Sequence, residues 1–566
     1  MDLVEPRKMT EAEVALVDET FREFHELDSA RGTWNSHCQE VAELIWPEHA
    51  NTFTFGNYNT PGAKKTSRQV DATGMLSLSR FAAICDSLNT PSNMEWHGLE
   101  ASDPYVNKDR QSKLWFEEAT RILFKYRYSP MANYTAQNQG VWKSLGAFGT
   151  GALFVDDFDG PQGGIRYRAL PMGEWRLRTN HQNMVIGGIR YFRLTASQAA
   201  SKWPREWLPG CILSALEKKN HTTLFAFFHR IWERKEDYDH RRPLNAKGKR
   251  FGSCYVSVEG RSLLQPESGY RSLPIATARY EQAPDESYGR GPAQAVLPSL
   301  KTLNAQKRSF LKQAHRAADP VLLTGDDGIV DFTLRPGALN KGGVNADGKA
   351  MVHVLPSGEI QVGEEAMTLE ANIIKDAFLV SLFQILVETP TMTATEVMER
   401  TVEKGILLAP TVGRQGPDYV AHHIDRELDI LIAQHLLPPM PPRLAEAEGE
   451  YKVVWKSPLA RAARAAHASG FMRTVQMGNE IAAATGDASV FDPLDMDAGM
   501  RMVAEVNNVP ESVMASDEAI AQKRQSRQNA QKRQEQIQAA PAQAALVKAQ
   551  AVAAKAGASS EGPPAQ

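Results

Sequence analysis

The chain has 566 residues, of which 42% are hydrophobic and 23% are charged, an ordinary composition for a folded protein that predicts about three or four domains. Its 64 Lys and Arg residues and 67 Asp and Glu residues leave a net charge of −3, which argues against a surface that is basic all over and grips nucleic acid. The four cysteines are far apart and predict neither a disulfide framework nor a zinc ribbon. The N-terminus has no apolar signal core, and the longest apolar run, 377–387, is shorter than the roughly 20 residues of a membrane span, so we expect no membrane association.

The first part of the chain predicts helices and then a sheet. Apolar residues at spacings of three to four predict helices over 10–46, 71–89, 110–127 and 131–147. Asp71 is expected to cap the second of these. From residue 150 onward the pattern changes to short strands separated by Gly, Pro and Asn turns. This sheet-bearing region is expected to end near Gly289, Gly291 and Pro292.

The segment 293–318 is helical in pattern, contains no acidic residue and carries five cations. Pro298 lies inside it, so the helix is either kinked or begins there. The cations are Lys301, Lys307, Arg308, Lys312 and Arg316. The Gly- and Asp-rich residues that follow, up to 366, predict a small β-rich insert between two long helices.

A second long helix is expected to run to about Val387 and is apolar on most sides, which is typical of a helix buried in a core or between subunits. Pro390 stops it. A new helix is expected to begin after Thr393, which stands three residues before Glu396 in the spacing of a capping box. Helices are expected again over 459–515, and the Ala- and Gln-rich tail 517–566 is expected to be partly disordered, with one solvated helix possible over 523–555.

No motif for catalysis or for a cofactor is apparent. No GxxxxGK[ST] or GxGxxG phosphate loop and no GxSxG nucleophile elbow occurs. The cluster of Asp156, Asp157 and Asp159 is more typical of a strand end and turn than of a metal site. His423 and Glu427 share a helix face, but two ligands do not make a zinc site, and a solvated or intersubunit charged face is expected there. We therefore expect no enzymatic activity, no cofactor and no metal.

Several longer segments resemble the portal proteins of short-tailed, T7-like bacteriophages (podoviruses), which connect the phage head to its tail. The resemblance covers about residues 20–510. Its carriers are WFEEATRILF, LGAFGTGALFV, SYGRGPAQAVLPSLKTLN, LKQAHRAADPVLL, RPGALNKGGVNADG, VETPTMTATEVMER and RELDILIAQHLLPPMPP. Together these segments are specific, whereas the C-terminal tail carries no recognisable pattern.

The resemblance implies a mainly helical α+β portal fold that assembles into a ring of about twelve subunits around a central channel. The implied parts are a wing (1–288), a first stem helix (289–318), a clip (319–366), a second stem helix (367–388), a tunnel loop (389–395), a tunnel helix returning to the wing (396–456), crown helices (457–516) and the tail (517–566). The ring is expected at one capsid vertex of the virion, after assembly in the host cytoplasm.

The resemblance also implies partners and candidate contact residues. The partners are genomic double-stranded DNA in the channel, the packaging terminase, tail adaptor proteins, and capsid, scaffold and internal core proteins. Residues expected to face DNA are Lys301, Arg308 and Lys312 in the stem and Thr389, Pro390, Thr391 and Met392 in the tunnel loop. Residues expected at subunit contacts are Phe378, Leu382, Phe383 and Leu386. The alternatives are a scaffold or tail structural protein without a channel, and an enzyme of DNA processing, against which the missing phosphate loop argues.

Overall fold

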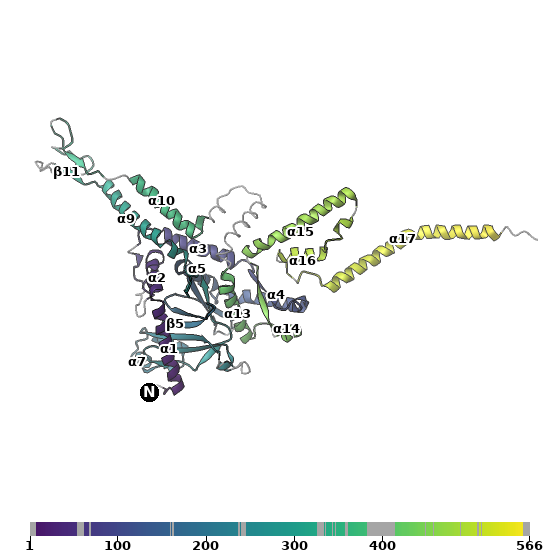
Figure 1. The fold of residues 1–566 in the computed structure, drawn as a ribbon, viewed down its shortest axis with the longest axis horizontal. Helices are drawn as coiled ribbons and strands as arrows, with labels where there is room; N and C mark the ends of the chain where they lie inside the picture. Colours follow the sequence, from purple (N-terminus) through teal and green to yellow (C-terminus); the bar gives the residue numbers. More distant parts are fainter. Residues whose placement is uncertain are drawn as a thin grey trace, which may run out of the picture. The chain divides into compact units, whose positions relative to one another are not determined.

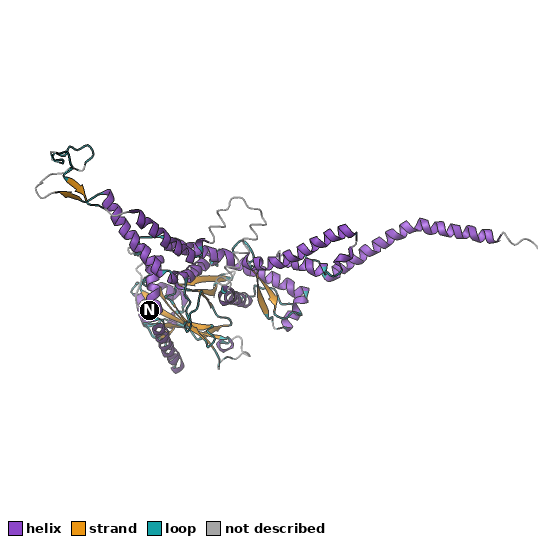
Figure 2. Cartoon of the chain, turned by 45° about the horizontal axis from the view of Figure 1, so that its top comes forward, coloured by secondary structure: helices purple, strands orange, loops and turns teal. Residues whose placement is uncertain are grey.

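The computed structural model describes residues 7–381 and 414–558 apart from short gaps at 54–61, 67–68, 159, 161–162, 236–237, 239–244, 325–332, 334, 342, 346, 357–359, 448, 457, 487, 507–508 and 511. The chain divides into two compact units. The first comprises Met1–Gly98, Ala119–Pro439 and Val453–His467, and the second comprises Leu99–Glu118, Met440–Lys452 and Ala468–Gln566. The fold is a mixed α+β fold with helices in both units, as Figure 2 shows.

The N-terminal helices differ from the sequence expectation at one point. The predicted helix 10–46 is two helices, α1 (Glu11–Ala30) and α2 (Gly32–Ile45), that meet at Arg31. The Arg31 side chain is buried and its guanidinium donates to the backbone oxygens of Trp175, at 2.6 Å, and Met172, at 2.9 Å. These contacts, made with residues far along the chain, lie where the two helices separate.

The next helices follow the predicted positions closely. They are α3 (Thr73–Asn89), α4 (Arg110–Arg127) and α5 (Tyr134–Phe148). The N-cap of α3 is Ala72 and not Asp71, so the expected cap lies one residue too early. The Asp71 carboxylate still accepts a hydrogen bond of 2.7 Å from the backbone nitrogen of Thr73. Gly149 ends α5 in the left-handed conformation that favours glycine.

A large antiparallel sheet forms the middle of the first unit. Its strands, β4 to β8 in order with β9 paired to β7, are β4 (Trp175–Thr179), β5 (Val185–Thr195), β6 (Leu224–Glu233), β7 (Phe251–Ser257), β8 (Ser262–Leu263) and β9 (Ser268–Tyr270). Successive residues of a strand point to opposite faces. Phe228 accordingly packs on Phe24 of α1, with ring centroids 4.4 Å apart, while Phe227 packs on Trp203, at 4.9 Å.

Helices therefore cover both faces of this sheet. The Phe227 face is covered by α6 (Ala196–Lys202) and α7 (Gly210–Glu217), two short helices that the sequence analysis did not identify. The other face is covered by α1. A second sheet has the order β10-β2-β3, built from β10 (Ile275–Arg279), β2 (Thr150–Asp157) and β3 (Ile165–Leu170). It lies against α5 and α13 (Ala421–Ala433).

Two long helices leave this body side by side and carry a small β-hairpin between them (Figure 1). They are α9 (Leu297–Ala318), which follows the short α8 (Pro292–Ala295), and α10 (Ile360–Ala377). The hairpin consists of β11 (Leu322–Thr324) and β12 (Val352–Val354). We call α9 and α10 the stem hairpin and residues 319–356 the insert.

The boundaries of the stem hairpin refine three expectations. Pro298 lies in the first turn of α9, so the helix begins there and is not kinked by it. α10 begins at Ile360, within the segment that was assigned to the clip. It ends at Ala377, and Leu379 just after it adopts a left-handed backbone with φ of 61°; residues 382–388 of the expected helix lie outside the described residues. Phe378 and Val380 on either side of Leu379 are buried, which holds this unusual conformation.

A further two-stranded sheet and the C-terminal helices belong to the fold. β1 (His97–Ala101) pairs with β13 (Tyr451–Trp455), a strand that follows α14 (Pro442–Glu446). The C-terminal helices are α15 (Pro458–Thr485), α16 (Met496–Val506) and α17 (Asp517–Ala558). All four cysteines are free, as expected; Cys38, Cys85 and Cys254 are buried, whereas Cys211 is exposed. No helix among the described residues is long and apolar enough to cross a membrane.

Candidate functional site

Two basic side chains of α9 are paired with carboxylates of the same chain, so they are less available for binding DNA than the sequence suggested. Lys301 forms an ion pair with Glu40 of α2, with a distance of 2.6 Å from Nζ to Oε2. That hydrogen bond holds the pKa of Glu40 below its usual value. Lys307 binds the carboxylate of Asp71 at 2.8 Å. Burial raises the pKa of Asp71, but the hydrogen bonds from Lys307 and Thr73 outweigh it and the pKa is lowered.

Arg308 and Lys312, the other two cations expected to face DNA, lie on exposed parts of α9. Lys312 lines a groove of about 370 Å³ that lies between the end of α9 and the two ends of the insert. The groove is lined by Ser309, Lys312, Gln313, Arg316, Val321, Leu355 and Pro356. The structure therefore separates Lys301, paired at the base of α9, from Lys312, which stands beside a second cation near the insert.

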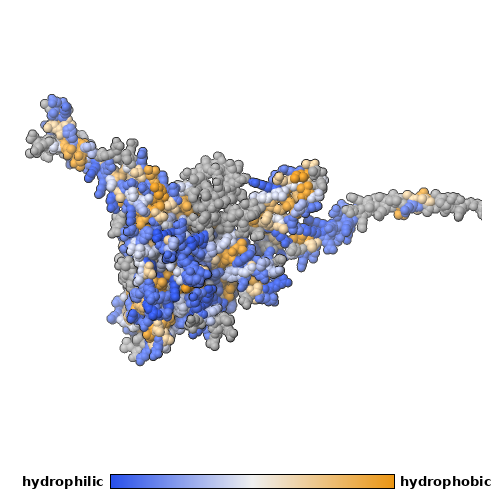
Figure 3. All heavy atoms as spheres, in the orientation of Figure 1, coloured by the Kyte–Doolittle hydropathy of each residue, from blue (hydrophilic) through white to orange (hydrophobic). Residues whose placement is uncertain are grey.

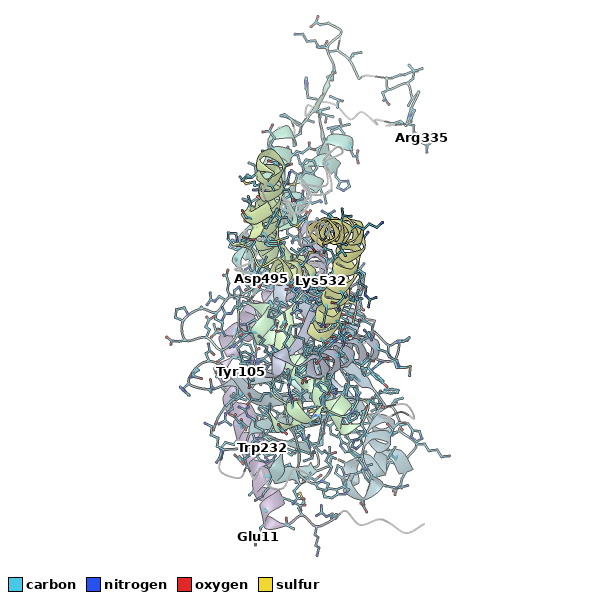
Figure 4. The ribbon with its side chains drawn as sticks, turned by 90° about the vertical axis from the view of Figure 1, so that its right-hand side faces the viewer. Glu11, Tyr105, Trp232, Arg335, Asp495 and Lys532 are labelled. Carbon is cyan, nitrogen blue, oxygen red and sulfur yellow. The ribbon has the colours of Figure 1, made fainter. Side chains whose placement is uncertain are left out.

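Apolar side chains are exposed along the stem hairpin and the insert. Leu369 and Ile373 of α10 lie one helical turn apart and are 66% and 49% exposed. Leu311 of α9 is a further large apolar residue that is exposed. In the insert the exposed apolar residues are Val321, Leu323, Leu339, Val344, Met351, Val354 and Leu355. Figure 3 shows apolar atoms gathered over α10 and over the insert, and Figure 4 shows Arg335 in the loop that extends beyond the hairpin. Exposed apolar residues that gather in this way are typical of an interaction surface.

The residues predicted at subunit contacts are largely outside the described part of the chain. Leu382, Phe383 and Leu386 belong to 382–413, which the structure does not describe, and so do the expected tunnel-loop residues Thr389 to Met392. Phe378 is described and is fully buried within its own chain, where its ring stands 6.0 Å from that of Phe81. Its surface is thus used inside the subunit. The exposed apolar residues of α10 precede it, at Leu369 and Ile373.

A buried charged network anchors α13, the helix that follows residues 382–413. Arg127 of α4 and Glu427 of α13 form a two-pronged ion pair, and both side chains are 0% exposed. Tyr167 of β3 donates a hydrogen bond of 2.7 Å to Glu427 Oε1, and Arg127 Nη1 donates to His97 Nε2 at 2.8 Å. The Arg127 guanidinium also lies over the ring of Trp96, 4.6 Å from its centroid. Four elements far apart in sequence therefore meet at one ion pair.

This network corrects the expectation that His423 and Glu427 form a solvated or intersubunit charged face. Both are fully buried, and the partner of Glu427 is Arg127, 300 positions earlier. Burial opposes the charge on Arg127, but the attraction of Glu427 outweighs it and raises the arginine pKa. Burial, aided by Arg127, lowers the pKa of both His97 and His423 far below the usual value. The two imidazoles are therefore neutral and do not compete with Arg127 for the carboxylate.

A second polar network fastens the start of the same helical segment. Tyr419 donates to Asn138 Oδ1 at 2.8 Å, and the amide of Asn138 donates to Asp86 and Thr90 at 2.8 Å each. Burial raises the pKa of Asp86. These contacts join α3 and α5 to the residues just before α13. The return of the chain into the body after residue 413 is thus held at two places.

The described residues contain no group of three or more His, Cys, Asp or Glu side chains placed to hold a metal ion. Asp156 and Asp157 lie side by side at the end of β2, where burial and the neighbouring Asp157 raise the pKa of Asp156 to about 6. Asp159, the third member of the cluster, is outside the described residues.

The buried histidines predict that the protein loses stability in mild acid. Burial lowers the pKa of His49 to about 4 and those of His97, His229 and His423 well below 6.5. In an unfolded chain these imidazoles bind protons near pH 6.5, so unfolding takes up protons below that pH and stability is fully present only above it. Between pH 6.5 and 4 each such group is expected to remove up to about 1.4 kcal/mol per pH unit.

Denaturant unfolding at pH 7.5 and at pH 5 measures this effect. Replacing buried His423 with leucine should make the stability less dependent on pH, whereas the exposed His221→Gln should leave the dependence unchanged. Equal free energies of unfolding at the two pH values would show that these imidazoles accept protons in the folded protein.

The chain is similar to known bacteriophage proteins over most of its length. The family model described as bacteriophage head to tail connecting protein matches residues 18–514. A probable portal protein of Bordetella phage BPP-1 is 27% identical over 551 residues, covering 94% of each chain. The portal protein of Salmonella phage epsilon15 is 24% identical over 516 residues, covering 89% of this chain and 90% of its own.

Two solved structures are also similar to the chain, each at 13% identity over 58% of its length. One is the virion of a native gene transfer agent particle, with a TM-score of 0.28 and 70% of the matched chain covered. The other is the neck of an empty gene transfer agent particle computed with C6 symmetry, with a TM-score of 0.30 and 72% covered.

Proposed function

Because the chain belongs to the family of bacteriophage head to tail connecting proteins, and is thus a phage portal protein and a structural component of the virion, we propose that it works as a closed ring of identical subunits. The ring contains about twelve copies, stands at one vertex of the capsid and surrounds a channel. Genomic DNA enters the head through this channel during packaging and leaves through it during ejection. The phage is of the short-tailed, T7-like type.

The observation that carries this proposal is the exposed apolar surface of the stem hairpin. A helix in a monomeric protein turns its apolar residues toward its own core, yet Leu369 and Ile373 of α10 point into solvent. In a ring each subunit presents two different faces to its two neighbours, and rotation closes the assembly. The apolar residues of α10 fit such a contact, with the stems of neighbouring subunits packed around the channel.

The insert supports the second part of the proposal, a docking site for other proteins. Its exposed apolar residues are separated from the body by the length of the two stem helices. We assign this surface first to the packaging terminase and then to the tail adaptor, which replaces the terminase when the head is full. The capsid, scaffold and internal core proteins contact other parts of the ring. The tunnel loop, Thr389 to Met392, is assigned to the channel wall on its sequence alone.

The proposal predicts that the purified protein is a ring. Native mass spectrometry is expected to show a species of about twelve times 62.6 kDa, and negative-stain images are expected to show a central hole. A tail or scaffold protein without a channel gives no hole. A single species at 62.6 kDa would contradict the proposal.

A further inference from the structure

The long C-terminal helix α17 contains a basic segment without an internal acid. Between residues 519 and 534 the chain has no Asp or Glu. The cations of this segment are Lys523, Arg524, Arg527, Lys532 and Arg533. Every side chain from residue 521 to residue 534 is exposed. We call residues 521–534 the basic segment; Figure 4 marks Lys532 within it.

The basic segment has no face that serves packing. A surface helix of a folded domain normally buries an apolar stripe against its core, but here the side chains are exposed all the way round. The helix is therefore presented to solvent over more than three turns. A polar helix that buries no apolar stripe in its own chain is explained if it meets a partner from outside.

The residue types in the basic segment match one kind of partner. Apart from Ala521 and Ala530, every residue is Lys, Arg, Gln, Asn or Ser. These are side chains that bind the phosphate and sugar groups of nucleic acids. The five cations lie all round the helix, because successive residues are 100° apart. Such a helix meets a polyanion in any rotation and without sequence specificity.

The cations of the basic segment are also less neutralised than those of α9. Lys301 and Lys307 of α9 are each paired with a carboxylate. In the described part of the second unit, Arg524 pairs with Asp497 at 2.6 Å, and it is the one cation of the basic segment in an ion pair there. The other four cations of the basic segment have no ion-pair partner in that described part. The net charge of the whole chain is only −3. Uncompensated local charge attracts phosphates even where the whole protein is close to neutral.

We propose that the basic segment of α17 binds the sugar-phosphate backbone of double-stranded DNA, without sequence preference and in a salt-dependent manner. The choice of duplex DNA among polyanions rests on the proposed function, because a portal ring stands where the genome enters the head. The proposal places the main DNA contact on α17, whereas the family resemblance implies a DNA contact on α9. It gives the Ala- and Gln-rich tail, which carries no family pattern, a binding role of its own.

The test compares the full-length protein with the variant K523Q/R527Q/K532Q/R533Q. Arg524 is kept so that its ion pair with Asp497 is preserved. Binding to a fluorescent 30-base-pair duplex is followed by anisotropy at increasing salt. Loss of two to three phosphate contacts is expected to weaken binding at low salt by about tenfold or more, and to make the slope of log K against log salt shallower by about 2 to 3.

The matched control is K218Q/K219Q, which removes two adjacent exposed cations at the end of α7. It is compared with K532Q/R533Q, which removes two adjacent exposed cations of the basic segment. The control should bind like the parent, and the second pair should bind more weakly. Circular dichroism confirms that α17 remains helical, since Gln is about as good a helix former as Lys and Arg.

Two results would overturn the proposal. One is an unchanged affinity and salt slope in the fourfold variant. The other is that the fourfold variant still binds DNA but no longer binds a polyglutamate peptide that the parent protein binds. This result would assign the segment to an acidic protein partner. Ring formation is measured separately by native mass spectrometry. If the parent protein forms no ring but the variant loses DNA binding, the proposed ring is refuted and the DNA-binding proposal stands. If the parent forms rings but the variant binds DNA unchanged, the ring stands and the DNA-binding proposal is refuted.

Discussion

Replacing Glu427 with glutamine is expected to lower the free energy of unfolding by about 3 to 5 kcal/mol. The substitution keeps the shape of the side chain but removes its charge, so the Arg127 guanidinium stays buried without a counter-charge. Arg127 is 0% exposed, so water does not solvate its charge. The hydrogen bond from Tyr167 loses its charged acceptor at the same time. Denaturant unfolding followed by tryptophan fluorescence reports the loss, because Trp96 lies against Arg127.

The double substitution R127M/E427L is the control for this experiment. Removing both charges and filling their space with apolar groups avoids the uncompensated charge, so the double variant should be more stable than E427Q. If E427Q unfolds like the parent protein, the ion pair does not hold α13 in place. If the double variant is as unstable as E427Q, the contacts of Arg127 with His97 and Trp96 matter more than its charge.

Placing aspartates at Leu369 and Ile373 is expected to abolish ring formation while the subunit remains folded. Both side chains are exposed in the single chain, so the substitution disturbs no core of the subunit. In a ring each copy of the contact would bury two carboxylates without partners, which is strongly unfavourable. Native mass spectrometry is expected to show the shift from the ring to a 62.6 kDa monomer.

Thr368→Asp provides the matched control, because this exposed residue lies on the same helix but about 100° away from Leu369. It adds a carboxylate to α10 outside the apolar pair and should leave rings intact. Rings that form normally with Asp at 369 and 373 would show that the apolar residues of α10 contact another protein, such as a tail component, and not a second subunit.

The local elements of this fold could be predicted from the sequence because their signals are local. The expected helix 110–127 agrees with α4 at both ends, and Pro298 begins α9 as an N-terminal proline does. The short strands expected from residue 150 onward are also present. The family was also identified correctly from short segments, whereas the short-tailed type and the ring itself stay predictions.

The parts that could not be predicted depend on contacts between distant residues. No property of the segment around Glu427 indicates that Arg127, 300 positions earlier, neutralises it. The separation of α1 from α2 occurs at Arg31, whose partners lie at 172 and 175. The end of α10 carries no Gly or Pro; the left-handed Leu379 follows it, between the buried residues Phe378 and Val380. Sequence periodicity reports which face is apolar, but it does not report what that face will meet.

The distribution of the four thiols has a practical consequence for counting subunits. Burial raises the pKa values of Cys38, Cys85 and Cys254, which keeps these thiols protonated as well as inaccessible. Cys211 at the start of α7 is exposed. A maleimide dye is therefore expected to attach to each subunit once, at Cys211, with no engineered cysteine. The number of bleaching steps seen from one labelled particle then equals the number of subunits in it, which determines the size of the assembly in solution without imposing any symmetry on an image.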